Sequence, residues 1–229
     1  METTTNGPIL VVMKNLNTFK ILILGSLTAL LMSSCGTKES TPLEQLPLGK
    51  AALIRHCLTC HSTIEMQRGP LLQGLEEFYL EEQLEAFKAG ARGLHPKDAN
   101  GLLMHSAIKE ISDDDLEFAA DWFSRQTRPE MIKVIKGDLE KGAALYKAAC
   151  YSCHEHPMGK LFSRSPDLYK SEDWYLLTQL RSYKAGWRGV DPRDEHGAKM
   201  KAAIEGFSMQ ELQDVVAYLG QFQQKPVSK

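Results

Sequence analysis

Hydrophobic side chains recur every three or four positions in several segments of this 229-residue chain, the spacing of one face of an α-helix. One such segment follows Ser112 and another follows Ser208, and serine is a typical helix N-cap. The apolar positions are Leu116, Ala119, Ala120 and Phe123 in the first segment, and Leu212, Val215, Val216 and Leu219 in the second. Glu211 completes a capping box with Ser208, and the aspartates at 113–115 suit the positive end of a helix dipole. No convincing alternating strand pattern occurs, so we expect an all-α fold.

The chain contains an internal repeat. Residues 78–93 align with residues 174–189 at a constant offset of 96. Single residues outside these segments keep the same offset: Pro70 and Pro166, Pro96 and Pro192, Gly101 and Gly197, Met104 and Met200, and Ser112 and Ser208. Because self-similarity at a fixed period marks a duplicated structural unit, we expect two copies of one small fold.

Each copy is expected to contain three short helices. A first helix leads from Gly49 or Gly142, and a middle helix ends at Gly90 or Gly186 as its C-terminal cap. The middle helices present Leu80, Leu84 and Phe87, and Leu176, Leu180 and Tyr183. The last helix is the one capped by serine. Three short helices make a thin core, which a buried apolar cofactor would complete.

The repeat and the N-terminal composition predict the domain boundaries. We expect residues 1–34 to be a targeting sequence, 35–46 a tether, 47–127 the first domain, 128–136 a linker and 137–225 the second domain. Length alone would allow one domain or two, and the repeat favours two.

Two copies of the pentapeptide Cys-x-x-Cys-His are the strongest chemical signal. They comprise Cys57, Cys60 and His61, and Cys150, Cys153 and His154. This spacing is typical of c-type haem attachment, in which both thiols bond to haem vinyl groups and the histidine binds iron. A tetrathiolate zinc site is less consistent, because the pairs lie 93 residues apart, and neither zinc nor a redox disulfide accounts for the two histidines. We therefore predict two covalently bound haem c groups.

Met104 and Met200 are the candidates for the second axial ligand of each iron. They are equivalent in the repeat and lie 43 residues after His61 and 46 residues after His154. A thioether is a soft, neutral ligand that favours ferrous iron and raises the reduction potential.

Other side chains suit the second axial position less well. Met66 and Met158 follow their own haem histidines too closely to cross the porphyrin, and neither has a repeat partner. His105 and His196 would give bis-histidine ligation, but they are not equivalent in the repeat. We expect both of these histidines to lie on the surface.

The fifth cysteine, Cys35, follows a segment with the layout of a bacterial secretory signal. A short basic region precedes an apolar run at 21–32, which is too short to span a membrane comfortably, and small residues stand beside Cys35. We predict that Cys35 is the lipidated first residue of a lipoprotein on the periplasmic side of a bacterial membrane, and that Met13 is a better initiator than Met1. An ordinary signal peptide or an uncleaved anchor is the alternative. With Cys35 lipidated and the other four cysteines bound to haem, no thiol would be left free, as suits an oxidising compartment.

Charge differs between the two expected domains. Residues 47–127 carry 8 basic and 13 acidic side chains, net −5, whereas residues 128–229 carry 16 basic and 13 acidic, net +3. Such an imbalance orients a protein toward a charged redox partner, or reflects only a solvated surface. No basic cluster is dense enough to indicate nucleic-acid binding.

The two copies resemble class I cytochromes c, and in particular the tandem two-haem cytochromes of the c-four subfamily. The resemblance covers nearly all of residues 47–222 and rests on specific motifs. These are the haem pentapeptides, a Pro-x-Leu segment, a Tyr-Leu-x-x-Gln-Leu helix ending in a Lys-x-Gly turn, and a methionine eight residues before a capping serine. They stand at Pro70–Leu72 and Pro166–Leu168, Tyr79–Leu84 and Tyr175–Leu180, and Met104 and Met200. The resemblance implies two small helical bundles, each around a covalent haem.

The resemblance also implies roles around each haem. The carbonyls of Pro70 and Pro166 would accept the second ring N–H of the adjacent haem histidine. The first and last helices would cross closely at Gly49 and Gly142, against Trp122 and Tyr218 respectively.

Two features leave the haem surroundings open. Arg92 and Arg188 follow the middle helices, where they either approach haem propionates or form a solvated basic turn. The glycine usual after the haem histidine is replaced by Ser62 and Glu155, and the loop before the proline is three residues shorter in the first copy.

Together these features predict an electron carrier and not an enzyme. We expect a membrane-tethered two-haem cytochrome c that exchanges electrons with redox proteins such as a quinol-oxidising complex, a terminal oxidase or a dehydrogenase. A di-haem peroxidase would need one open distal site, and the equivalent methionines disfavour it. A cytochrome subunit of a larger oxidoreductase remains an alternative.

Overall fold

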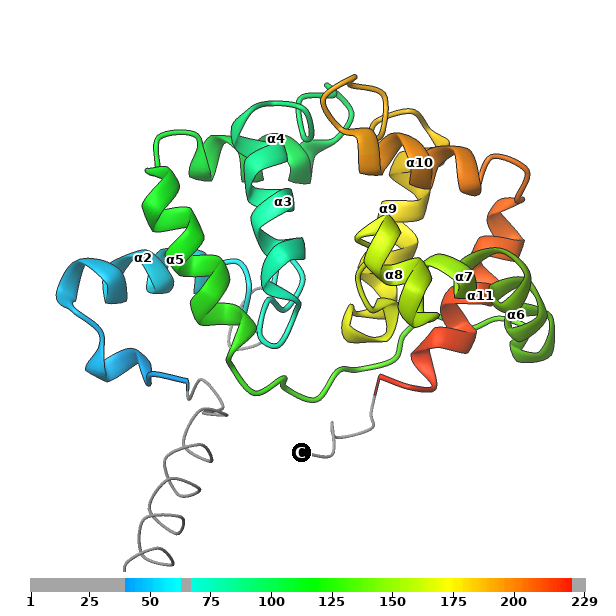
Figure 1. Cartoon of the computed structure of the whole chain (residues 1–229), viewed down its shortest axis with the longest axis horizontal. Coiled ribbons are helices and arrows are strands. Elements are labelled where there is room, and N and C mark those ends of the chain that lie inside the picture. The colour runs from blue at the N-terminus through cyan, green and yellow to red at the C-terminus, as the bar shows by residue number, and fades with distance from the viewer. Residues whose placement is uncertain (1–39, 63–66, 224–229) are drawn as a thin grey trace, which may run out of the picture. The chain divides into compact units, whose positions relative to one another are not determined.

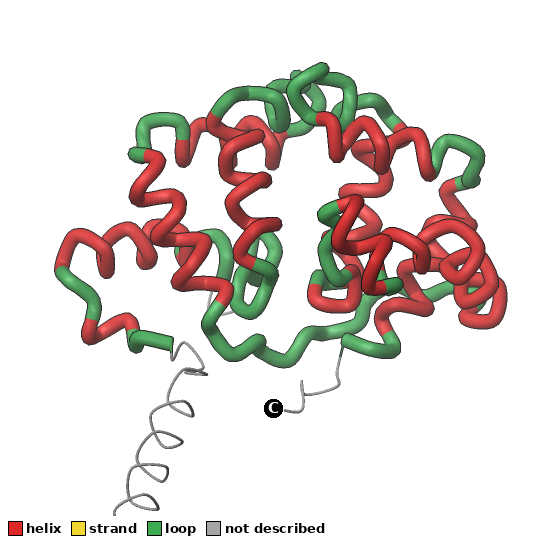
Figure 2. Tube along the Cα trace, viewed as in Figure 1, coloured by secondary structure: helices red, strands yellow, loops and turns green. Residues whose placement is uncertain are grey.

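Helices form all the regular structure of residues 40–62 and 67–223, the part of the chain that the computed structural model describes. No strand occurs among these residues, which confirms the expected all-α class (Figures 1 and 2). The first repeat contains η1 (Leu43–Gln45), α2 (Leu48–Leu58), α3 (Glu77–Lys88), α4 (Ala99–Ile108) and α5 (Asp113–Ser124). The second contains α6 (Leu139–Leu145), η2 (Tyr146–Cys150), α7 (Tyr151–His154), α8 (Pro157–Ser163), η3 (Leu168–Lys170), α9 (Asp173–Lys184), α10 (Glu195–Ala203) and α11 (Met209–Gly220).

The residues predicted to be a targeting sequence, and Cys35, lie outside the described residues. The described part begins at Ser40 and belongs to one compact unit. None of its helices is long and apolar enough to cross a membrane.

Helix ends follow the sequence signals closely. Ser112 caps α5 through the Asp115 N–H, and Ser208 forms the expected capping box with Glu211 at the start of α11. Gly90 and Gly186 follow α3 and α9 with φ of 72° and 69°, a left-handed conformation that glycine adopts without a Cβ clash.

The expectation of three helices in each copy was wrong, because the described residues form four α-helices in the first repeat and six in the second. The second repeat adds the short α7 and α8 around its pentapeptide. In both repeats the methionine-bearing segment forms a further helix, α4 or α10. Each begins at an aspartate, Asp98 or Asp194, whose carboxylate accepts from a backbone N–H three residues on, at 2.9 Å and 2.8 Å. These aspartates are N-caps that could have been recognised in the sequence.

Each repeat has its own apolar core between its first, middle and last helices. The first consists of Ile54, Leu75, Leu80, Ala119, Ala120, Trp122 and Phe123, and the second of Tyr146, Leu176, Leu177, Val215, Val216 and Leu219. Helix α3 packs against α5, and α9 packs against α11 in the same way. The predicted apolar faces contribute to these two cores, and their remaining buried residues form two smaller clusters: Phe87 and Leu116 in the first repeat, and Tyr183 and Leu212 in the second.

The two helix crossings implied by the family resemblance differ. A Cβ on Gly142 would lie 2.1 Å from the Asp214 carbonyl oxygen and 3.0 Å from Tyr218 Cβ, so α6 and α11 meet as closely as implied. Gly49 has nothing within 4 Å of a Cβ, so the implied contact at Gly49 was wrong. The buried face of α2 begins later, at Ala51, which is 3% exposed.

The segment predicted as a linker is attached to both repeats. Arg128 donates to the Gln73 carbonyl in the first repeat at 2.9 Å. The fully buried Asp173 in the second repeat accepts from Val134 N and Ile135 N, both at 2.8 Å. These bonds constrain the segment that joins the repeats.

Candidate functional site

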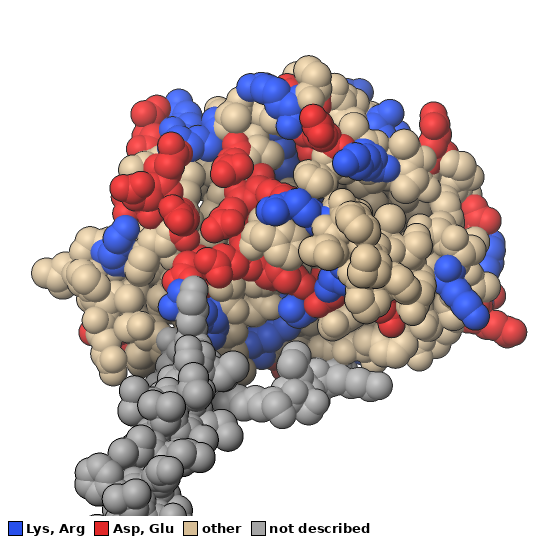
Figure 3. Space-filling view, viewed as in Figure 1, with Lys and Arg blue, Asp and Glu red and all other residues tan. Residues whose placement is uncertain are grey.

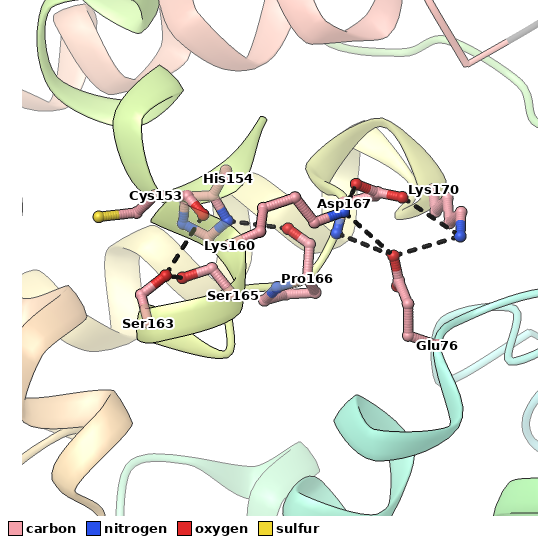
Figure 4. A network of polar contacts seen from close by, with 9 residues as sticks. All are labelled: Glu76, Cys153, His154, Lys160, Ser163, Ser165, Pro166, Asp167 and Lys170. Atoms are coloured by element: carbon pink, nitrogen blue, oxygen red, sulfur yellow. Dashed lines mark hydrogen bonds and ion pairs between the residues drawn. The ribbon is translucent and has the colours of Figure 1, made fainter. Parts of the chain in front are cut away.

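The histidine of each pentapeptide is held in the same way. His61 Nδ1 lies 2.6 Å from the Pro70 carbonyl oxygen, and His154 Nδ1 lies 2.9 Å from that of Pro166 (Figure 4). Both histidines are buried, at 9% and 8% exposure. Because Nδ1 donates to the carbonyl, Nε2 is the ring nitrogen left to bind a metal.

Burial also sets the charge of these rings. Desolvation lowers the pKa of His61 and of His154, although the proline carbonyls act in the opposite direction. The rings are therefore neutral at pH 7, and the neutral imidazole is the form that binds iron.

The backbone at Gly69 lies close against the His61 ring. A Cβ on Gly69 would lie 2.3 Å from His61 Cε1, so only glycine allows the backbone to pass this ring. The equivalent residue in the second repeat is Ser165, which bonds to Ser163 at 2.7 Å. The backbone beside the ring thus differs between the two sites.

The first cysteine of each pentapeptide packs on a core. Cys57 contacts the first core and Cys150 the second. Burial raises the pKa of both thiols to about 11. Both thiols are therefore protonated and uncharged at pH 7.

The second cysteines, Cys60 and Cys153, are more accessible. Cys60 is half-buried and Cys153 is exposed. All four cysteines of the described residues are free thiols, and these residues contain no group of three or more His, Cys, Asp or Glu that could hold a metal ion.

The backbone enters the two pentapeptides differently. Helix α2 runs through Cys57 to Leu58 as a regular α-helix. In the second repeat a π-helical segment, Tyr146–Cys150, precedes the short α7 that carries Cys153 and His154. Such π-helical segments occur often at functional sites because they redirect side chains.

Both candidate methionines lie on equivalent helices. Met104 on α4 packs against Phe87, Ile108 and Leu116. Met200 on α10 packs against Tyr183, Ile204 and Leu212, which are the same repeat positions. The structure therefore places the two methionines in matching apolar surroundings, and their role as iron ligands stays a prediction.

The other candidate ligands are placed as follows. His196 is exposed, as expected. His105 is half-buried, and its Nδ1 lies 2.6 Å from the Phe87 carbonyl oxygen, so the expectation of a surface histidine was wrong. Met158 lies on α8 and is 53% exposed, whereas Met66 lies outside the described residues.

Arg92 and Arg188 are buried at the junction between the repeats, 5% and 7% exposed. Each donates to the amide oxygens of both Gln83 and Gln179. Three of these bonds measure 2.6–2.9 Å, and Arg92 also donates to the Tyr175 hydroxyl at 3.1 Å. The solvated-turn interpretation was therefore wrong, and an approach to haem propionates stays a prediction.

Sequence reasoning missed the partners of these arginines. Gln83 and Gln179 stand at the same place in the Tyr-Leu-x-x-Gln-Leu motif, where they were counted only as part of a helix. A polar residue repeated on the otherwise apolar side of two matching helices was the available signal.

Acidic side chains gather over α3 and α5 on the face shown in Figure 3. They are Glu77, Glu81, Glu82 and Glu85 on α3, and Asp113, Asp114, Asp115, Glu117 and Asp121 on α5. The lysines at 199 and 201 flank Met200 on α10 of the second repeat.

Comparison with known proteins agrees with this geometry. Residues 139–223 match the family model for cytochrome c. The thiosulfate dehydrogenase electron acceptor of Stutzerimonas stutzeri (strain A1501) is 26% identical over 184 residues, which are 74% of this chain and 80% of the relative. Cytochrome c4 of Azotobacter vinelandii is 28% identical over 154 residues, 62% of this chain and 73% of that protein.

A solved structure supports the same fold. Reduced recombinant cytochrome c4 from Pseudomonas stutzeri aligns with a TM-score of 0.55 and 26% identity, over 77% of this chain and 96% of that chain. These comparisons show that the chain is similar to class I di-haem cytochromes c and that its helical fold is consistent with two cytochrome c domains. The cofactor is covalently bound haem c, and the Cys57/Cys60 and Cys150/Cys153 pairs fit its attachment motif.

Proposed function

We propose that this protein is a lipid-anchored electron carrier on the periplasmic side of a bacterial membrane, which accepts electrons from a dehydrogenase and passes them to a further redox protein. The observation that carries the proposal is the equivalence of the two sites. Each repeat presents a buried histidine held by a proline carbonyl and a methionine on the matching helix. Two closed sites suit electron exchange, whereas a peroxidase needs an open distal position.

The chain's own residues keep each site rigid. When bound, haem supplies an iron that changes by one electron between ferric and ferrous states. The cysteines attach the group to helix ends that pack on the cores, and the proline carbonyls fix the orientation of both histidine rings. A ligand that does not reorient when the iron changes oxidation state keeps the structural reorganisation small, which favours rapid electron exchange.

The charge pattern supports docking through the second repeat. Lys199 is exposed and Lys201 half-exposed on α10, beside Met200. An acidic partner surface would be attracted to this helix and repelled by the acidic α3 and α5. The relatives named as electron acceptors of thiosulfate dehydrogenase make such an enzyme the first donor to test.

Stopped-flow reduction tests the proposal. The purified ferric protein is mixed with thiosulfate and a thiosulfate dehydrogenase, and haem reduction is followed by absorbance. We expect reduction that slows steeply with ionic strength, and a slower association when Lys199 and Lys201 are changed to glutamate. The matched control changes Asp113 and Asp114 to lysine in the first repeat and should have little effect. Absence of reduction would reject this donor, and a rate insensitive to salt would reject docking by charge.

A further inference from the structure

A glutamate from each repeat bonds to the peptide group beside the haem histidine of the other repeat. Glu172, in the second repeat, accepts from Leu71 N at 2.8 Å. Glu76, in the first repeat, accepts from Asp167 N at 3.2 Å (Figure 4). The two glutamates are related by the repeat offset of 96, and so are the two residues whose N–H groups they accept from.

The peptide groups involved are the ones that hold the haem histidines. The Leu71 N–H belongs to the same amide as the Pro70 carbonyl, which accepts from His61 Nδ1 at 2.6 Å. The Asp167 N–H likewise shares its amide with the Pro166 carbonyl, which accepts from His154 Nδ1. A carboxylate, an amide and an imidazole are thus joined in one chain of hydrogen bonds at each site.

A carboxylate that accepts from an amide N–H polarises that amide and makes its carbonyl oxygen a stronger acceptor, because bonds in a chain reinforce one another. A stronger acceptor on Nδ1–H increases the electron donation of the ring to iron and so favours the ferric state. On the basis of the proposed histidine ligation, we propose that Glu172 and Glu76 are positioning residues, each of which lowers the reduction potential of the haem in the opposite repeat.

The hydrogen bonds that the two glutamates accept from the amides differ in strength. Glu172 is 4% exposed, and it also accepts from the neutral donors Gln67 Nε2 and Trp174 Nε1 at 2.8–3.1 Å. The Glu76 oxygen that accepts from Asp167 N also accepts from the Lys170 ammonium at 3.2 Å. The Glu172 oxygen that accepts from Leu71 N is shared only with the neutral Gln67, whereas the Glu76 bond to the amide is longer and its oxygen is shared with a cation, so we expect the effect of Glu76 to be the smaller one.

Redox titration of the full-length holoprotein tests this inference. Met104→Ala and Met200→Ala first assign each potential to its haem. Glu172→Gln replaces a charge-assisted bond, which is about twice as strong as a neutral one. We expect it to raise the ferrous-to-ferric ratio of the haem on Cys57 and Cys60 by about three- to tenfold at a fixed potential, where tenfold is ~59 mV for one electron. Glu76→Gln should raise the ratio of the other haem, by less.

Two further variants separate the hydrogen bond from charge and from packing. Glu172→Asp keeps the charge but moves the carboxylate away from the Leu71 N–H. If the hydrogen bond sets the potential, this variant should show most of the rise in the ferrous-to-ferric ratio seen in Glu172→Gln. A purely Coulombic effect predicts no rise. Glu82→Gln removes a cross-repeat carboxylate that pairs with Arg164 at 2.5 Å and touches neither proline peptide, so both ratios should stay unchanged. Nuclear magnetic resonance of the ferrous protein should show the His61 Nδ1 proton shifting in Glu172→Gln while that of His154 does not.

A rise confined to the haem on Cys150 and Cys153, or equal in both haems, would overturn the inference. So would an unchanged ratio in a folded Glu172→Gln protein with two haems. If the two methionine variants leave both potentials unchanged, the proposed axial ligands fail instead, and the proton shift of His61 still decides the role of Glu172.

Discussion

The junction between the repeats should depend on one amide oxygen of Gln83. Arg92 and Arg188 both donate to this oxygen, the latter at 2.6 Å, and both guanidinium groups are buried. Gln83→Leu keeps a similar volume but removes the acceptor from two charged donors. Hydrogen bonds to charged groups contribute about 1.5–3 kcal/mol each, and each arginine keeps its bond to Gln179, so we expect a loss of roughly 3 kcal/mol in the free energy of unfolding.

Urea unfolding of the ferric holoprotein, followed by far-ultraviolet circular dichroism, measures this loss. Gln83→Glu is the matched control because it keeps the acceptor oxygens and adds a charge opposite two guanidinium groups, so its stability should equal or exceed that of the wild type. Gln83→Leu within about 0.5 kcal/mol of the wild type would refute the reasoning, since ordinary surface substitutions fall in that range. Equal losses in both variants would show that the shape of Gln83 matters and its acceptor does not.

Three other predictions concern the axial ligands, the lipid anchor and the stability at low pH. Met104→Ala and Met200→Ala should each remove about half of the weak far-red sulfur-to-iron band and lower one potential, and an unchanged band in both would reject the axial assignment. Cys35→Ser should release the protein from membranes washed with high salt, because acyl chains supply most of the affinity, and retention would indicate an uncleaved helix or a bound partner. Burial raises the pKa of the Asp167 carboxyl, but hydrogen bonding and its ion pairs with Lys160 and Lys170 outweigh this and lower it to about 2. The wild type should therefore lose stability as the pH falls from 3.8 to about 2, and Asp167→Asn should lose less in thermal melts over that range.

The repeat allowed much of the fold to be predicted. Helix starts and ends depend on local signals. The helices therefore begin after Ser112 and Ser208 and end before the glycines at 90 and 186, as predicted. The helices carrying the methionines were missed because their N-cap aspartates were overlooked.

The contacts between the repeats could not be predicted in the same way. Whether Arg92 lies in solvent or against Gln179 depends on how two domains pack, which no local pattern encodes. The reach of Glu172 to Leu71 spans 101 positions and becomes visible only when the domains are together. Similarly, the family resemblance implied close helix crossings at both Gly49 and Gly142, but only Gly142 lies close to another helix.

The central claim is that both haems are closed by axial ligands and exchange single electrons. Spectroelectrochemical titration of the purified holoprotein, with carbon monoxide added to the ferrous state, tests it most directly. We predict two reversible one-electron steps per chain, loss of the far-red band on reduction, and no carbon monoxide adduct at either haem. A single step, or a haem that binds carbon monoxide at once, would reveal an open iron and contradict the account.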